Sequence, residues 1–357
     1  MPRRVFLHIG TPKSGTSYLQ DRLDLNRDAV AKAGLTYLPT RTGDHFEAAL
    51  DLIEERWAGQ GAVAKGQWAA IVAEAKRTSG DVLISHEILA AASSAQVAKA
   101  MAAFAGDEVH VILTARDLAR QIPAEWQELI KHRSRRSFKK FMSEVAQGRR
   151  SSPTLWFWRV QSIPDVLTRW GNGLAPAQVH VVTVPPKGGP PGELWKRFAG
   201  VVGIDPRVAK VESTNFNASL GVAEASVVRR LNKLLSPKRI PRAVYIDLVR
   251  DVVVRGSLGA RPDPIPVVVP QGRWPFVEKV TGEWLEWIQG AGVDVVGDLS
   301  DLVPARPGPD HVWIHPDEPP ADQVADAAIE ALAAVIAGVA PTHTSPVRRI
   351  ARKLLRG

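Results

Sequence analysis

The sequence predicts an α/β fold, a doubly wound parallel sheet flanked by helices, with a mostly helical C-terminal part. Four short runs are nearly all apolar and rich in β-branched residues, as parallel strands covered on both faces are; they span residues 5–9, 81–87, 109–116 and 179–184. Helical patterns alternate with them. Polar residues follow three of the runs, where open α/β sheets bind their ligands.

The helical patterns follow the runs in order. A pattern after the first run ends at Gly34, an expected C-cap. A second begins near Ser94, an expected N-cap. Further patterns cover residues 67–80, 218–235, 275–292 and 321–338.

Composition divides the chain near residue 304, where a proline-rich stretch begins. We expect one domain over residues 1–304, and a linker, helix and basic tail over residues 305–357. The tail, "SPVRRIARKLLRG", is basic and amphipathic. Two interpretations of it stay open, a solvated chain end and peripheral membrane contact.

The bulk composition excludes several classes of protein. The chain has 357 residues, 45% of them hydrophobic, which suits a folded protein with a core. It has no cysteine, so disulfides and thiolate chemistry are excluded. The net charge of +9 suits an anionic ligand, while the lack of zinc-finger, basic-zipper or RNA-binding signatures disfavours nucleic acid. No apolar run is long enough for a signal peptide or membrane span, so we expect a cytoplasmic protein.

The turn after the first run, "GTPKSGTS", has the composition of an anion cradle. Gly10 and Gly15 allow backbone N–H groups to converge on an anion, and the helix that follows adds its positive end. Lys13 adds a full charge. It precedes the second glycine, whereas the common nucleotide loop places lysine after that glycine.

This turn resembles a known family. "TPKSGTSYL" is similar to the 5′-phosphosulfate loop of sulfotransferases that use PAPS (3′-phosphoadenosine 5′-phosphosulfate), written Pro-Lys-Ser/Ala-Gly-Thr-Ser/Thr. Residues 1–300 look like the bacterial branch of that family, whose fold is like that of the P-loop nucleotide hydrolases. The resemblance implies sulfuryl transfer from PAPS, leaving PAP, by in-line attack of a hydroxyl or amine. The acceptor would be a small molecule, carbohydrate or lipid, and no metal is expected.

The resemblance also implies roles for individual residues. Lys13 would stabilise the bridging oxygen as the S–O bond breaks. Arg116 would pair with the 3′-phosphate, the other reading being an ion pair with Asp117. The remaining donor-binding candidates are Pro12, Ser14, Gly15, Thr16 and Ser17 around the 5′-phosphate, and Tyr18 against the adenine.

Two departures from the family pattern concern the 3′-phosphate. The family places a serine eight residues after the arginine, but this chain has Ala124 there, and Gln121, Gln127 or Lys131 could substitute. The family's C-terminal Arg-Lys-Gly element is also missing, and residues 255–261 or 270–274 could replace it.

Three residues are candidates for the base that takes the acceptor proton. His86 follows the second run, where the family often has a histidine, and its ordinary pKa is near neutrality. Glu87 is adjacent and could serve instead. His45, after Asp44, is the third candidate, whereas we expect His8 to be a satisfied core histidine.

Two other functions stay open. One is an ATP-dependent small-molecule kinase, which would need magnesium. The other is a non-catalytic homologue that binds PAP or PAPS. The acceptor and the oligomeric state cannot be read from the sequence. Four tryptophans could line an acceptor pocket, although we expect most to be core: residues 126, 156, 158 and 170.

Overall fold

The structure is a computed structural model. It describes residues 2–39, 45–54, 64–148, 154–214, 219–308 and 313–339. The chain forms two compact units that are discontinuous in sequence. The first comprises residues 1–128, 137–217 and 268–313, and the second comprises residues 129–136, 218–267 and 314–357. The expected domain division at residue 304 stays a prediction, and the tail from 340 onward lies outside the described residues.

The first unit contains a parallel sheet, which confirms the predicted fold class. The order of the strands in the described residues is β2-β3-β1-β4-β5-β6, and every pairing is parallel. Their bounds are β1 Arg4–Gly10, β2 Leu35–Tyr37, β3 Asp81–Ser85, β4 Glu108–Ala115, β5 Val179–Thr183 and β6 Asp294–Val296. The four predicted runs are β1, β3, β4 and β5, the four consecutive strands in the middle of the sheet.

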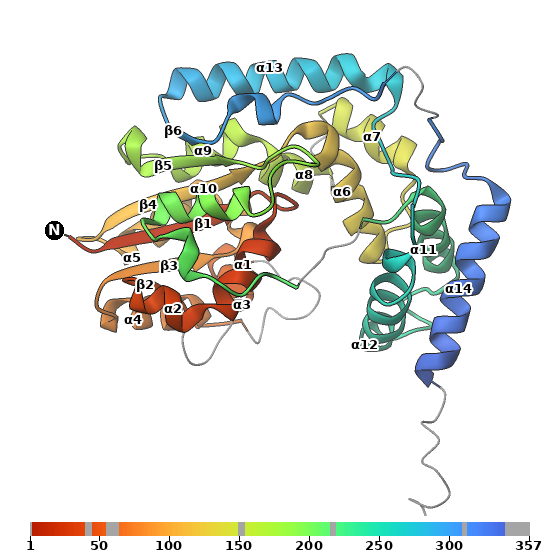
Figure 1. Ribbon diagram of the computed structural model, residues 1–357, viewed down its shortest axis with the longest axis horizontal. Helices are drawn as coiled ribbons and strands as arrows, with labels where there is room; N and C mark the ends of the chain where they lie inside the picture. Colours follow the sequence, from red (N-terminus) through yellow and green to blue (C-terminus); the bar gives the residue numbers. More distant parts are fainter. Residues whose placement is uncertain are drawn as a thin grey trace, which may run out of the picture. The chain divides into compact units, whose positions relative to one another are not determined.

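Helices cover both faces of this sheet (Figure 1). On one face, α1 Thr16–Leu25, α2 Arg27–Lys32 and α10 Glu193–Val202 pack on side chains such as Phe6, Leu83 and Ile112. The right-handed crossovers between β2, β3, β4 and β5 place other helices on the opposite face. These are α3 His45–Ile53, α4 Gln67–Arg77, α5 Ser94–Ala103, α6 Leu118–Lys131, α7 Phe138–Ala146, α8 Thr154–Gln161 and α9 Ile163–Trp170, with α13 Trp274–Ala291 against α9.

Two details of the helices correct the sequence predictions. The single helix expected before Gly34 is broken at Asn26 into α1 and α2, because the Asn26 amide bonds the backbone of Val211 in both directions, at 2.8 and 2.9 Å. The N-cap of α5 is Ser93 rather than Ser94. Ser93 and Gln96 form a reciprocal capping box there.

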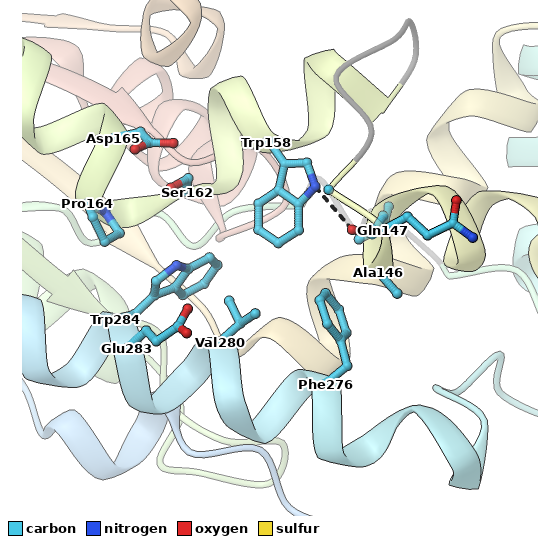
Figure 2. A pocket seen from close by; sticks show the side chains of 12 residues that line it. Ala146, Gln147, Trp158, Ser162, Pro164, Asp165, Phe276, Val280, Glu283 and Trp284 are labelled. Carbon is cyan, nitrogen blue, oxygen red and sulfur yellow. Dashed lines mark hydrogen bonds between the residues drawn. The ribbon is translucent and has the colours of Figure 1, made fainter.

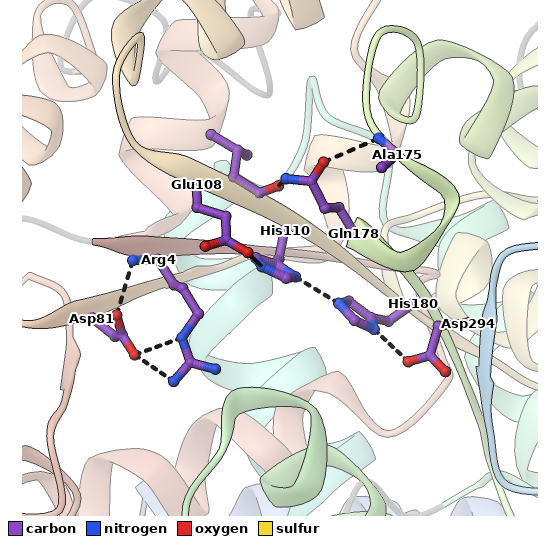
Figure 3. A network of polar contacts seen from close by, with 9 residues as sticks. Arg4, Asp81, Glu108, His110, Ala175, Gln178, His180 and Asp294 are labelled. Atoms are coloured by element: carbon purple, nitrogen blue, oxygen red, sulfur yellow. Dashed lines mark hydrogen bonds and ion pairs between the residues drawn. The ribbon is translucent and has the colours of Figure 1, made fainter. Parts of the chain in front are cut away.

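The amino-terminal ends of the strands are tied together by polar contacts (Figure 3). Arg4 at the start of β1 binds the Asp81 carboxylate at the start of β3, with N–O distances of 2.6 to 2.9 Å. A chain of two stacked imidazoles crosses the next three strands. It runs from Glu108 through His110 and His180 to Asp294, with contacts of 3.1, 2.9 and 2.6 Å.

The second unit is helical in the part that the structure describes. It contains α11 Val222–Leu234, α12 Arg242–Val244, a π-helical segment Tyr245–Arg255 and α14 Ala321–Val339. Tyr245 donates to the Asn232 side chain at 2.6 Å, which ties α11 to the π-helical segment. No helix among the described residues is long and apolar enough to cross a membrane.

Candidate functional site

The three predicted polar segments lie on three adjacent strands. The glycine loop follows β1, His86 and Glu87 follow β3, and Arg116 follows β4. Because β3 and β4 flank β1, their carboxyl ends meet at one edge of the sheet. In the strand order, the chain leaves β1 toward β2 in one direction and leaves β4 toward β5 in the other. The loops after β1 and β4 therefore diverge between these two neighbouring strands, where such sheets form a crevice that binds ligands.

The loop has the backbone conformation of a tight anion cradle. Gly10 and Gly15 have φ values of 81° and 84°, which glycine adopts without strain. Lys13 also has positive φ, 63°, a sparsely populated conformation for a non-glycine residue that is often found at functional sites. A Cβ at Gly10 would lie 2.6 Å from Glu87 Cβ, so the glycine lets the segment after β3 approach the loop.

The first turn of α1 is available for an anion. Gly15 is its N-cap and supplies no side-chain cap, so the leading N–H groups of the helix lack the usual side-chain partner. Thr16 is buried, whereas Ser17 is half-buried in this turn. The Ser14 hydroxyl is already occupied by the Thr11 carbonyl and the Thr114 hydroxyl. Ser14 can therefore contribute its backbone to an anion, rather than its side chain.

Lys13 is surrounded by carboxylates. Its ammonium donates to Glu128 Oε2 at 2.7 Å, and both side chains are about 30% exposed. Burial disfavours the charged ammonium, but the fields of Glu128, Glu125 and Glu87 outweigh it and raise the pKa of Lys13. The lysine is thus firmly charged and held by α6 in this arrangement.

Arg116 points back toward the loop. Its guanidinium donates to the Lys13 carbonyl oxygen at 3.3 Å. Asp117 pairs with Arg120 instead, and Arg116 forms no ion pair within the described residues. Burial and the nearby Arg120 lower the pKa of Arg116 to about 10. A half-buried cation whose neighbouring carboxylate pairs elsewhere can bind an anion.

A buried polar chain links the three strands beneath the loop. His8 Nδ1 lies 2.7 Å from the Ser85 hydroxyl of β3, and His8 Nε2 lies 3.2 Å from the Thr114 hydroxyl of β4. The Thr114 hydroxyl continues to Ser14 at 2.6 Å. Burial lowers the pKa of His8 to about 4, so this ring is neutral. The expectation that His8 is a satisfied core histidine is confirmed.

The two other histidines carry their proton on Nε2. His86 caps the short helix Glu87–Ala91, and its Nδ1 accepts from the Ile88 N–H at 3.2 Å. His45 is buried, and its Nδ1 accepts from the Ser85 N–H at 3.2 Å. Burial lowers the pKa of His45 to about 3. An Nδ1 that accepts a hydrogen bond places the ring proton on Nε2, so in these tautomers both rings are donors there.

Glu87 is the acceptor in this group. The Gln20 amide is 3.4 Å from its carboxylate. Burial opposes ionisation, but the positive charge of Lys13 and the hydrogen bonds, among them that from Gln20, help to outweigh it and lower the pKa of Glu87. Its carboxylate is therefore ionised at neutral pH and can accept a proton.

Residues of α6 and α8 hold the glycine loop, and the sequence analysis did not assign Glu125, Glu128 or Gln161 to the site. Gln121 donates to the Pro12 carbonyl at 2.8 Å, and Gln161 of α8 donates to the same oxygen at 2.9 Å. Gln161 also binds Glu125 at 2.8 Å, and burial raises the pKa of Glu125 to about 7. The spacings between residues 121, 125 and 128 are four and three, so the three side chains share one face of the helix that follows Arg116. This spacing is a sequence signal that could have identified them. Ala124 is half-buried on this helix.

Three further predicted contributors have partners of their own. The Tyr18 hydroxyl accepts from Arg22 at 3.0 Å, and the ring packs on the core cluster of the α1 face. The Gln121 amide donates to the Thr11 hydroxyl, the Pro12 carbonyl and the Gln161 side chain, and its predicted role at the 3′-phosphate stays a prediction. Arg261, within residues 255–261, pairs with Glu224 and Glu330 of its own unit.

Comparison with protein families and with curated proteins gives no match. Among solved structures, the chain is similar to a sulfotransferase from Alicyclobacillus acidocaldarius. The TM-score is 0.38 at 14% identity, over 58% of this chain and 83% of that chain. A likeness of this size decides nothing about activity, which has to be argued from the geometry of the site.

Proposed function

We propose that this chain is a sulfotransferase that moves a sulfuryl group from PAPS to a hydroxyl or amine of a small-molecule, carbohydrate or lipid acceptor. The observation that carries the proposal is the loop after β1. Its lysine precedes the second glycine, has positive φ, and lies beside a helix start that lacks a side-chain cap. That arrangement suits an anion whose leaving oxygen needs a fixed ammonium.

The residues present fit the two charged ends of PAPS. The first turn of α1, with Gly15, Thr16 and Ser17, offers N–H and hydroxyl donors for the 5′-phosphosulfate. Arg116 offers a planar donor fork for the 3′-phosphate, and its hydrogen bond to the Lys13 carbonyl links both ends through one residue. The side-chain amides of Gln121 and Gln161 both donate to the Pro12 carbonyl, which stabilises the conformation of the loop.

Lys13 would carry the chemistry of bond cleavage. PAPS supplies the transferable sulfuryl group, and negative charge grows on its bridging oxygen as the S–O bond breaks. The Lys13 ammonium would stabilise that charge. To do so, Lys13 must break its ion pair with Glu128 when the donor binds. The free-energy cost is small, because a partly exposed ion pair contributes about 1 kcal/mol or less. Glu128 would thus hold the lysine in place before the donor binds.

Of the three candidate bases, Glu87 is the one that the hydrogen bonds favour. An acceptor hydroxyl or amine has to give up its proton as it attacks sulfur in line. Nε2 of His86 and of His45 already carries a proton, whereas the Glu87 carboxylate is ionised. We therefore propose Glu87 as the base. His86 would orient the acceptor by donating from Nε2.

A non-catalytic PAP-binding protein is the second candidate function. The Lys13–Glu128 ion pair and Ala124 favour it, because the first occupies the proposed catalytic group and the second omits a phosphate donor. Binding of PAP without transfer to any acceptor would identify this function.

The test is sulfate transfer from radiolabelled PAPS to a cell extract and to a panel of purified acceptors, with and without EDTA. We expect labelled product in both conditions. Loss of activity in EDTA together with phosphate transfer from ATP would instead identify a kinase. Glu87→Gln should abolish most transfer and leave PAP binding intact, and His86→Gln should have the smaller effect. The reverse order would assign the base to His86.

A further inference from the structure

A separate pocket lies among the helices of the first unit. It has a volume of about 500 Å³ and is lined by the end of α7, by α8 and α9, and by α13. None of its lining residues belongs to the glycine loop or to the segments that come directly after β3 and β4. This volume is within the range of small-molecule sites. The pocket therefore needs an explanation of its own.

Aromatic rings form its walls (Figure 2). Trp158 and Phe276 stand nearly perpendicular, at 83°, with ring centroids 6.3 Å apart. The Trp158 indole donates to the Val145 carbonyl at 3.2 Å, which fixes the orientation of the ring. Figure 2 shows Trp284, on α13 like Phe276, as a third ring around the same space. Rings held in this way present a fixed π surface to a ligand.

The described lining of the pocket carries two carboxylates. They are Asp165 and Glu283, and the lining residues that the structure describes include no Lys, Arg or His. Lys279 lies 3.9 Å from Glu283, but both side chains are mostly exposed, so this ion pair is weak. Asp165 forms no ion pair within the described residues. Two carboxylates have thus been placed beside aromatic rings in a chain whose net charge is +9.

We propose that this pocket binds a small organic ammonium ion. A cation is attracted by ring faces and by carboxylates together, whereas an anion would be repelled by Asp165 and Glu283. A neutral sugar could stack on Trp158 and donate its hydroxyls to the two carboxylates, but it carries no charge for them to attract, and the two probes below differ in that charge alone. The combination therefore selects a positively charged head group with an apolar surface. The pocket shares no lining residue with the proposed transfer site.

The probe is choline, compared with its neutral isostere 3,3-dimethylbutan-1-ol, on the full chain. Binding is followed by two-dimensional NMR of the tryptophan indole N–H groups, with Trp158 assigned by Trp158→Leu. We expect choline to shift the Trp158 signal and to bind about tenfold more tightly than the isostere. Equal binding of both probes, or no shift at up to about 20 mM choline, would overturn the proposal.

Surface variants test the contribution of charge without disturbing the fold. Glu283→Gln should weaken choline binding by about threefold, and Asp165→Asn combined with it by about tenfold. Glu286→Gln is the matched control, because it makes the same change on the same helix outside the pocket, and it should leave affinity unchanged. Lys279→Gln should strengthen binding slightly. Equal losses in Glu283→Gln and Glu286→Gln would contradict a specific site.

Discussion

The two ends of the sheet both carry histidines, but the partners of the rings differ. At the amino end, His110 and His180 contact carboxylates, Glu108 and Asp294. At the carboxyl end, the ring nitrogens of His8 face the hydroxyls of Ser85 and Thr114. The other two histidines at that end accept hydrogen bonds from backbone N–H groups.

The different partners of the histidines indicate that polar groups have different roles at the two ends of the sheet. At the amino end, the carboxylates and imidazoles form a clamp that ties the edge strand β6 to the sheet, and burial lowers the pKa of His180 there too. At the carboxyl end, His8 and His45 are kept neutral by burial and supply no charge. The cations beside the glycine loop are Lys13 and Arg116, and the positive end of α1 adds to their field. The predictions below test this division.

The largest expected effect is the loss of stability when a methyl group is added at Gly10, at the carboxyl end of the sheet. Gly10→Ala forces a Cβ to 2.6 Å from Glu87 Cβ at a φ of 81°. We expect it to lower the free energy of unfolding by about 3 kcal/mol or more. Gly34→Ala, before β2 at the amino end, is the matched control, because φ is 98° but nothing lies within 4 Å of the new Cβ. It should lose only about 1 kcal/mol in urea unfolding. Equal losses would show that the close approach of Glu87 is unimportant.

The second prediction concerns acid stability. His8 has a pKa of about 4 in the fold, against 6.5 when exposed. The unfolded chain therefore binds a proton below pH 6.5 that the folded chain binds only near pH 4, so stability falls as the pH drops through this range. The difference amounts to about 3 kcal/mol.

The measurement is urea unfolding of wild type and of His8→Asn between pH 7.5 and 4. The variant should be less stable at pH 7.5 and depend less steeply on pH, so that the two curves converge in acid. Parallel curves would mean that His8 does not contribute to the acid sensitivity.

A smaller effect is expected at the clamp of the amino end. Asp294→Asn removes the charge that faces His180 at 2.6 Å, and because Asp294 is 45% exposed we expect a loss of about 1 kcal/mol. The loss should appear as faster amide exchange in β6, at Val295 and Val296. The control Glu278→Gln removes an exposed charge paired with Arg306 and should leave β6 unchanged. Unchanged exchange in Asp294→Asn would contradict the clamp.

The smallest effect should come from the carboxylate that holds Lys13. Glu128→Gln removes a competitor of the donor, and we expect PAP to bind about two- to fivefold more tightly, measured by calorimetry. Weaker binding would mean that the positioning of the lysine by Glu128 outweighs its competition with the donor. Glu193→Gln, on α10 in a partly buried network with Lys196 and Arg197, is a suitable control.

Much of the fold could be predicted because the four central strands are continuous apolar runs. The strands β2 and β6 were missed, since each has only three residues and is defined by pairing with a neighbour. The break at Asn26 was missed because its cause is Val211, far away in sequence. In both cases the deciding contact is not local.

The candidate site was predictable to a similar extent. The loop, His86 and Arg116 could be found because each ends a strand, and the sheet order then brought them together. Glu125 and Glu128 could not be assigned by the same rule, because they lie on the helix α6. They come close to the loop only because of the way this helix is oriented against it. Their roles, like those of the predicted residues, await measurement.

The central claim is that the Lys13 loop binds PAPS and promotes cleavage of its S–O bond. The most direct test is transfer of radiolabelled sulfate by wild type, Lys13→Ala and the exposed control Lys196→Ala. We predict that Lys13→Ala lowers transfer by about 100-fold or more and that the control has no effect. Transfer that survives in Lys13→Ala at the wild-type rate would contradict the account.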